Sequence, residues 1–345
     1  MKIRSFDTDK KVLVIAEIGN NHEGSYRLAK RLVRLAAKAG ADAVKFQVIV
    51  PDELVSMKDK KRIRQLRRFQ LSRSEYIKLH EIAKNEGVLF ITSPFNLKSI
   101  EYLTPLVSAF KVASGDNNFF PLIGNMARTG KPLIVSTGMS TIDKIAATKT
   151  FIENIWKKQK IVQEMAILHC VSAYPVPSEE ANLLAVRTLR RRFRCTVGYS
   201  DHTNGTDAAV WAVVLGARII EKHFTINKHY SRFHDHALSA TPEEFSLMVR
   251  KIRKSVRALG DGDKRLQRSE RPTEKKARRS IVAACRLKKG DLVRWGNISW
   301  IRPGGGLEPG QEYKIVGKAL KRSLKKGDML LLKDLTKIKR KNRRS

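Results

Sequence analysis

The chain of 345 residues is long enough to bury a large core, and its hydrophobic content of 42% is ordinary for a globular protein. Its 69 Lys and Arg residues give a net charge of +36, but they are spread along the chain with few aromatic residues between them, which argues against a specific nucleic-acid-binding protein. No apolar run reaches the length of a signal-peptide core or a membrane span, and the three cysteines lack paired spacing. We therefore expect a cytoplasmic protein without disulfides or membrane contact.

The first 264 residues alternate short apolar runs with helical segments, a pattern typical of βα units around a parallel sheet. Helical spacing predicts helices over 25–39, over 206–215, which is too apolar to face water, and over 241–259, where Thr241 is the expected N-cap. The fold class is therefore α/β, a (β/α)8 TIM barrel over residues 1–264. Its eight predicted strands are 12–18, 43–46, 89–92, 109–112, 133–136, 166–169, 196–199 and 219–223.

The sequence beyond the barrel has a different texture. A basic linker over 265–279 is followed by short strands, tight turns and Lys-Gly pairs over 280–336, which predicts a small β-rich domain. The pentapeptide LKKGD occurs twice there, at 287–291 and 324–328. Residues 337–345 are basic and poor in apolar side chains, so we expect a disordered tail.

Polar residues follow the predicted strands at the end where TIM barrels place their active sites. Lysines and serines together suit a phosphate-bearing ligand, and two imidazoles at neighbouring strand ends suggest a divalent metal. Glu17 is suited to act as a general base, although an ordinary ion pair with Lys45 explains it equally well. The candidates named on these grounds are Glu17, Lys45, Gln47, Ser93, Lys111, Ser114, Asp116, Ser136, Ser172, Tyr174, His202 and His223.

Eight ordered segments resemble the sialic acid synthases and their relatives that make nine-carbon nonulosonic acids. The segments are IAEIGNNHEGS (15–25), AGADAVKFQ (39–47), TSPF (92–95), FKVASGD (110–116), GKPLIVSTGM (130–139), HCVSAYP (169–175), VGYSDHT (197–203) and EKHFT (221–225). The resemblance covers nearly the whole chain. It implies a transferase that condenses phosphoenolpyruvate with the open-chain aldehyde of an N-acylated hexosamine, either N-acetylmannosamine or a diacetamido-hexose, and releases phosphate.

The resemblance also assigns roles. It implies that His202 and His223 hold a divalent metal, manganese with magnesium or cobalt as alternatives, and that Glu17 handles the attacking water. It places Asp235 near the sugar. Phosphoenolpyruvate contacts carry over to Lys45, Ser93, Lys111, Ser114, Ser136 and Tyr174, and Gln47, Asp116 and Ser172 complete the expected substrate-binding set.

The second domain resembles the antifreeze-protein-like (SAF) module of these synthases, with IRPGGG at 301–306. By the resemblance, Arg302 reaches the sugar in the barrel of a partner subunit, so a domain-swapped homodimer is expected. Asp116 and Ser172 stand where the family commonly has glutamate and asparagine, and Ser93 replaces a frequent threonine. The shorter side chains leave room for a bulkier acceptor, such as the diacetamido sugar used for legionaminate.

Two alternatives stay open on the sequence alone. One is another phosphoenolpyruvate-dependent aldol-type synthase of a sugar-acid phosphate, which would need an extra basic pocket for a phosphorylated acceptor. The other is a basic nucleic-acid-binding scaffold on an inactive barrel, motivated only by the charge of +36.

Overall fold

The computed structural model describes residues 1–336, and the basic tail predicted for 337–345 lies outside them. The chain divides into two compact units, 1–261 and 262 onward. No helix within residues 1–336 is both long and apolar enough to cross a membrane.

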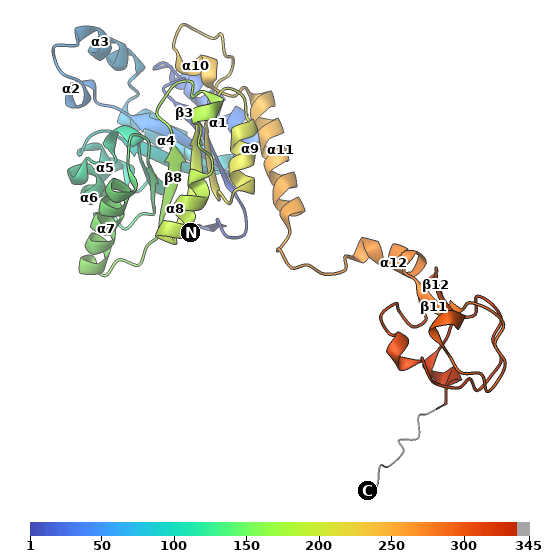
Figure 1. The fold of residues 1–345 in the computed structure, drawn as a ribbon. Coiled ribbons are helices and arrows are strands. Elements are labelled where there is room, and N and C mark those ends of the chain that lie inside the picture. Colours follow the sequence, from blue (N-terminus) through green and yellow to red (C-terminus); the bar gives the residue numbers. More distant parts are fainter. Residues whose placement is uncertain (337–345) are drawn as a thin grey trace. The chain divides into compact units, whose positions relative to one another are not determined.

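The first unit is a closed barrel of parallel strands, in the order β10-β3-β4-β5-β6-β7-β8-β9 (Figure 1). Each observed strand overlaps one of the eight predicted runs, which confirms the TIM barrel. The strands are β3 (Leu13–Gly19), β4 (Ala43–Val48), β5 (Leu89–Pro94), β6 (Ala109–Val112), β7 (Leu133–Ser136), β8 (Met165–Cys170), β9 (Thr196–Asp201) and β10 (Ile219–His223).

Helices alternate with these strands, and local sequence sets their ends. The Ser25 hydroxyl accepts from the backbone of Leu28 at the start of α1, and Thr241 and Glu244 form a capping box at the start of α11. Gly260, with φ of +63°, follows the last turn of α11. The helices are α1 (Tyr26–Lys38), α2 (Pro51–Leu54), α3 (Lys60–Phe69), α4 (Arg73–Asn85), α5 (Ser99–Leu103), α6 (Phe120–Arg128), α7 (Ile142–Gln159), α8 (Ala185–Phe193), α9 (Asp207–Val214), α10 (Asp235–Leu238) and α11 (Pro242–Leu259).

The prediction that the 206–215 helix does not face water was wrong in part. In α9, Ala208, Ala209, Ala212 and Val213 are buried, but Trp211 and Val214 are 57% and 50% exposed. The helix packs against α11 and the barrel strands with its small residues, which leaves its larger ones outside.

The interior of the barrel is apolar toward the N-terminal ends of the strands. Inward positions here carry Leu13, Ile15, Ile91, Ala109, Ile134, Ala166, Leu168 and Ile219. An N-terminal hairpin of β1 (Lys2–Ile3) and β2 (Phe6–Asp7), which the sequence did not predict, adds Met1 and Ile3 to this cluster and closes that end. The next inward positions, two residues further along each strand, are polar. The candidate site therefore lies inside the barrel, toward the C-terminal ends of the strands.

The second unit is built around β11 (Ser280–Ala283) and β12 (Ile298–Ile301), which pair antiparallel. The two LKKGD repeats meet in space, because the backbones of Leu287 and Leu324 exchange two hydrogen bonds of 2.9 Å. The Asp of each repeat accepts from the backbone of its first Lys at 2.7 Å. The stretch predicted as a linker contains the helix α12 (Arg271–Ala277).

Candidate active site

The inward positions above the apolar layer form a buried polar layer, which we name the inner polar layer. It consists of Glu17, Lys45, Ser93, Lys111, Ser136 and Glu221, each no more than 5% exposed. Burying charges is costly unless they are paired, and these are paired with one another. Lys45 Nζ lies 2.9 Å from Glu17 Oε1 and 3.5 Å from Glu221 Oε1, and Lys111 Nζ lies 3.7 Å from Glu221 Oε1. The layer therefore contains two lysines and two glutamates in contact, so each positive side chain has a negative partner.

Neutral donors and acceptors orient these charges. Lys111 donates to Ser136 Oγ at 2.5 Å, and Lys45 donates to Ser93 Oγ at 3.4 Å. Gln47 Nε2 donates to Glu17 Oε1 at 3.0 Å. Glu17 Oε2 and Glu221 Oε2 are buried without a hydrogen-bond partner among the described residues. Unsatisfied buried oxygens cost stability, so they indicate groups kept free for a ligand or water.

Burial and the neighbouring charges perturb the pKa values of the carboxylates in opposite directions. Burial raises the pKa of Glu17, against the attraction of Lys45. The pKa of Glu221 is about 2, because Lys111 and Lys45 together outweigh the effect of its burial. Burial lowers the pKa of Lys111. Two carboxylates with separated pKa values allow one to remain a fixed counter-charge while the other exchanges a proton.

His202 and His223 lie next to each other above this layer, with ring centroids 5.6 Å apart. His202 Nδ1 lies 2.8 Å from the carbonyl oxygen of Val171, which can only accept, so Nδ1 carries a proton. Burial opposes the charged form of His202, but the interactions with Cys170 and Val171 outweigh it and raise the pKa of the ring. His223 Nδ1 is buried with no hydrogen-bond partner in the described chain. Burial lowers the pKa of His223 to about 4, so its imidazole is neutral at neutral pH.

Two adjacent imidazoles fit a divalent metal, which would bind each ring in its neutral form and displace any second proton on His202. Within residues 1–336 no group of three or more His, Cys, Asp and Glu side chains is arranged to hold a metal ion. The protein would therefore supply two ligands, and water or substrate oxygens would complete the coordination.

A second ion pair behind the strands holds the turn that carries His202. Lys222 Nζ lies 3.0 Å from Asp201 Oδ2 and donates to the Thr203 carbonyl at 2.6 Å, and both charged side chains are fully buried. Asp201 Oδ1 also accepts from the backbone and hydroxyl of Thr203. These groups alternate with the inward residues of β9 and β10, so they fix the position of His202 from outside the barrel.

A serine-lined recess lies at the ends of β6, β7 and β8. Ser114 Oγ accepts from the backbone N–H of Gly138 at 3.1 Å and donates to Cys170 Sγ at 3.4 Å. Ser172 Oγ is buried without a described partner. A Cβ on Gly138 would overlap both hydroxyl oxygens. The recess therefore exists because residue 138 is glycine. The Ser172 hydroxyl has no described partner to give up, and an anion would take the Ser114 hydroxyl from Cys170 Sγ.

The rim of the site carries larger polar groups. The ring of Tyr174, half exposed, lies 4.3 Å from that of His202. Asp235, at the start of α10, pairs with His234 at 2.8 Å. Burial raises the pKa of Asp116 to about 6.

The segment that bears Asp235 is anchored by a buried chain of polar groups. His236 lies between Glu23 Oε1 at 3.0 Å and Thr225 Oγ1 at 2.6 Å. Asn21 donates to the Phe224 carbonyl and to Ser239 Oγ, each at 2.9 Å. The loop after β3 therefore fixes the loop after β10.

Comparison with known proteins agrees with this geometry. The model of the NeuB family matches residues 32–264, and that of the SAF domain matches residues 278–336. The chain belongs to the NeuB family.

Similar proteins of this family include the pseudaminic acid synthase of Campylobacter jejuni, 37% identical over 96% of this chain and 98% of that protein. The N,N'-diacetyllegionaminic acid synthase of the same species is 35% identical over 93% and 99% of the two chains. Among solved structures, the sialic acid synthetase of Leptospira borgpetersenii in complex with citrate is 31% identical with a TM-score of 0.73, covering 79% of this chain and 94% of that one.

In this NeuB-family chain the inner polar layer and its surroundings bring many of the predicted residues into contact. Lys45 and Gln47 contact Glu17, and Ser93 accepts a hydrogen bond from Lys45. Lys111 contacts Ser136, and the ring of Tyr174 lies beside both histidines. Arg302 lies in the second unit, directly after β12, and is exposed.

Sequence reasoning missed Glu221, Ser200 and Cys170. Ser200 donates to Glu221 Oε1 at 3.2 Å, and Glu221 is the shared partner of both lysines. The signal was present, because residues two apart on a strand face the same side, so an inward His223 makes Glu221 inward as well. The sequence analysis selected His223 as the functional residue of this strand and did not consider Glu221.

Proposed function

We propose that this NeuB-family chain is a nonulosonic acid synthase, a transferase that condenses phosphoenolpyruvate with the open-chain aldehyde of an N-acylated hexosamine and releases phosphate. The observation that carries the proposal is the inner polar layer, in which the buried side chains of Lys45 and Lys111 lie one strand position below the imidazoles of His202 and His223. Phosphoenolpyruvate brings a phosphate and a carboxylate on adjacent atoms, and Lys45 and Lys111 are suited to neutralise them. The relatives named as nonulosonic acid synthases support the same reaction.

The reaction forms one carbon–carbon bond and one carbon–oxygen bond. Carbon 3 of phosphoenolpyruvate bonds to the aldehyde carbon, whose oxygen gains a proton. Water adds to carbon 2, and the bond from carbon 2 to the bridging phosphate oxygen breaks, which leaves a 2-keto acid and inorganic phosphate. Glu17 is suited to take the proton from that water, because Lys45 and Gln47 hold Oε1 while Oε2 stays free.

The proposed anion contacts extend from the inner layer to the recess. Ser93 and Ser136 already orient the two lysines, and Ser114 offers a hydroxyl beside the Gly138 backbone. Serine hydroxyls fix the orientation of an anion without adding charge. Glu221, with its low pKa, remains the counter-charge that keeps both lysines protonated in the absence of substrate.

His202 and His223 would hold the divalent metal, manganese or else magnesium or cobalt. When bound, the metal would polarise the aldehyde oxygen as a Lewis acid. The residues themselves position the acceptor: Tyr174 covers the imidazoles, and Asp235 lies on a segment anchored from behind by Glu23 and His236.

The acceptor is expected to contact Asp116, Ser172 and Asp235. The support for an acceptor with a second acetamido group over N-acetylmannosamine is the short side chains of Asp116 and Ser172 together with the named legionaminic and pseudaminic acid synthase relatives. Arg302 would complete the sugar site from the SAF domain of a partner subunit in a homodimer.

A coupled assay tests the reaction. Phosphate release should require phosphoenolpyruvate, an N-acylated hexosamine and a divalent ion together, and omission of any one should reduce it to background. Steady phosphate release without a hexosamine would contradict the proposal.

Acceptor binding is expected to weaken at acid pH through Asp116. Its pKa of about 6 makes it a carboxylate, and hence a hydrogen-bond acceptor for sugar hydroxyls, only above that pH. The KM for the acceptor should rise about tenfold for each pH unit below 6. The KM for phosphoenolpyruvate should depend less on pH. Steady-state kinetics from pH 5 to 8 measures this. In Asp116→Asn the acceptor KM should be high and nearly independent of pH. If the pH dependence of the acceptor KM is the same in this variant as in the wild type, Asp116 does not bind the acceptor.

Gly138→Ala is expected to lower kcat/KM for phosphoenolpyruvate about 100-fold, because its Cβ overlaps Ser114 and Ser172 and displaces the recess by the order of an ångström. Gly296→Ala is the matched control, since its Cβ would meet no atom within 4 Å. Kinetics of both variants checks the prediction. Equal activity of the two would show that the recess does not bind phosphoenolpyruvate.

A further inference from the structure

Helix α8 carries a concentration of positive charge that the catalytic proposal does not use. Four of its residues and its C-cap are arginines, all exposed: Arg187, Arg190, Arg191, Arg192 and the C-cap Arg194. None of them forms an ion pair with an Asp or Glu among residues 1–336. Like charges three and four residues apart on a helix repel one another and destabilise it. The helix dipole favours arginines in the last turn, but without an anionic partner in the described chain the cluster is available to bind one.

The cluster lines a groove of about 670 Å³ between α8 and the end of α9, which we name the α8–α9 groove. Its lining residues are Leu184, Arg187, Thr188, Arg190, Arg191, Arg194 and Leu215. Space for Arg190 depends on Gly216, because a Cβ there would lie 2.9 Å from a guanidinium nitrogen. No lining residue belongs to the inner polar layer or the serine recess. The groove is thus a separate feature of the barrel.

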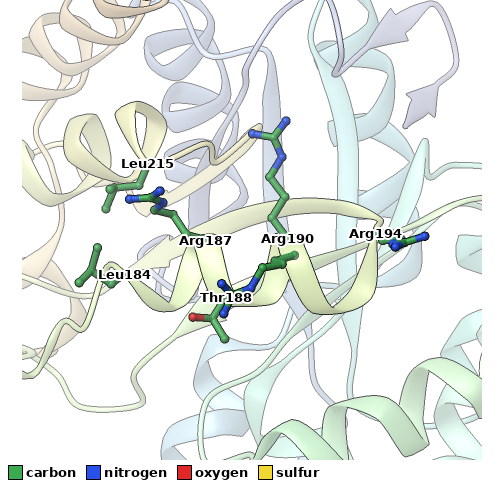
Figure 2. A pocket seen from close by; sticks show the side chains of 7 residues that line it. Leu184, Arg187, Thr188, Arg190, Arg194 and Leu215 are labelled. Carbon is green, nitrogen blue, oxygen red and sulfur yellow. The ribbon is translucent and has the colours of Figure 1, made fainter.

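The arrangement of the guanidinium groups indicates an extended ligand. Figure 2 shows Arg187, Arg190 and Arg194 fanning out along the helix rather than converging on one point. From Arg187 to Arg194 the helix rises roughly 10 Å, a distance over which a nucleic-acid strand carries about three phosphates. Guanidinium groups bind phosphate oxygens in pairs, so a row of them matches a phosphodiester backbone.

Trp211 on α9 is 57% exposed and stands one helical turn before Leu215, which lines the groove. Leu184, also in the lining, is 61% exposed. An exposed indole one helical turn from a groove residue offers a surface on which a base stacks. A second copy of the chain is a poor occupant, because a symmetric contact would place arginines against arginines.

We propose that the α8–α9 groove and Trp211 form a binding face for single-stranded nucleic acid, with phosphates on the arginines and a base on the indole. The net charge of +36 attracts polyanions to every face, so the test must separate this groove from general attraction. Full-length protein and a fluorescein-labelled single-stranded RNA of twelve nucleotides serve for this purpose, with binding measured by fluorescence anisotropy at several salt concentrations.

The decisive variant is R187Q/R190Q/R191Q/R194Q. Its matched control is K288Q/K289Q/K325Q/K326Q, which removes four exposed charges from the two LKKGD turns of the second unit. The groove variant should bind at least about 30-fold more weakly than the control. Its slope of log K against log salt should fall by about 2.1, because about three phosphate contacts are lost and each contributes about 0.7. Trp211→Ala should weaken binding at least about fivefold with an unchanged slope.

Three results would overturn the proposal. Equal losses of RNA affinity in the groove variant and its control would show that binding is general charge attraction. Unchanged RNA affinity of Trp211→Ala would show that no base stacks on the indole. A polyglutamate peptide of equal charge that competes as strongly as RNA would make the groove a surface for acidic polypeptides instead. Thermal unfolding checks that the variants fold, and exposed Arg→Gln changes on α8 should raise rather than lower Tm.

Discussion

Lys111→Met is expected to lower kcat/KM for phosphoenolpyruvate by about 1,000-fold, because an anion in the inner polar layer loses one of its two ammonium partners. The same change leaves Glu221 with Lys45 as its remaining cationic partner at 3.5 Å. Removing one member of a buried ion pair destabilises a protein by about 3 kcal/mol. Urea unfolding and steady-state kinetics of one preparation measure both effects.

A double variant separates catalysis from stability. In Lys111→Met/Glu221→Gln the buried charge is neutralised, so most of the lost stability should return, whereas the activity should not. Recovery of activity together with stability would mean that Lys111 acts only as a structural counter-charge. If the kcat/KM of Lys111→Met is within tenfold of the wild-type value, Lys111 does not bind the anion.

His223→Ala is expected to lower kcat at least about 1,000-fold, because the aldehyde oxygen would lose its electrophilic stabilisation. The unfolding temperature without metal should change little, since His223 Nδ1 has no described hydrogen bond to lose. The rise in Tm on addition of Mn²⁺, expected for the wild type from preferential binding to the folded state, should disappear. His202→Ala should lose activity and the Mn²⁺-dependent rise in Tm in the same way, but it should also lower Tm without metal, because it removes the hydrogen bond to the Val171 carbonyl.

The matched control is His229→Ala, an exposed histidine in the loop six residues beyond the end of β10. It should retain activity and the Mn²⁺-dependent rise in Tm. Titration calorimetry with Mn²⁺ gives an independent readout, with binding lost in the two strand-end variants and kept in the control. Undiminished Mn²⁺ binding by His223→Ala would contradict the proposed metal ligands.

The barrel was predictable because each of its eight strands is a short apolar run followed by polar residues. The resemblance of eight segments to the nonulosonic acid synthases further predicted the family, which the family models confirm. The small N-terminal hairpin was not predictable, since β1 and β2 have two residues each and no periodicity. Their place is set by contacts of Met1 and Ile3 with strands distant in the sequence.

The candidate site was predictable only in part, for a specific reason. Polar residues crowd the ends of β9 and β10, and the sequence did not say which of them face inward. The structure separates them: Asp201 and Lys222 pair behind the strands, while Glu221 enters the inner polar layer with the lysines. Likewise, nothing in the sequence shows that Gly138 makes room for Ser114 and Ser172, which come together only in the closed barrel.

The buried polar side chains of the candidate site argue against the alternative of a nucleic-acid scaffold on an inactive barrel. Buried lysines, carboxylates and free imidazole nitrogens are costly to keep, and an inactive barrel would have no reason to retain them. The nucleic-acid face proposed for the α8–α9 groove is an additional property of an enzyme, and its variants leave the inner polar layer intact.

Mass spectrometry of the product tests the central claim most directly. The protein is incubated with phosphoenolpyruvate, Mn²⁺ and, in separate reactions, N-acetylmannosamine and diacetamido-hexoses. The account predicts a product with the mass of the acceptor plus pyruvic acid, formed in a one-to-one ratio with inorganic phosphate, and the highest kcat/KM for a diacetamido-hexose. A product that retains the phosphate of phosphoenolpyruvate, or no product from any N-acylated hexosamine, would contradict it.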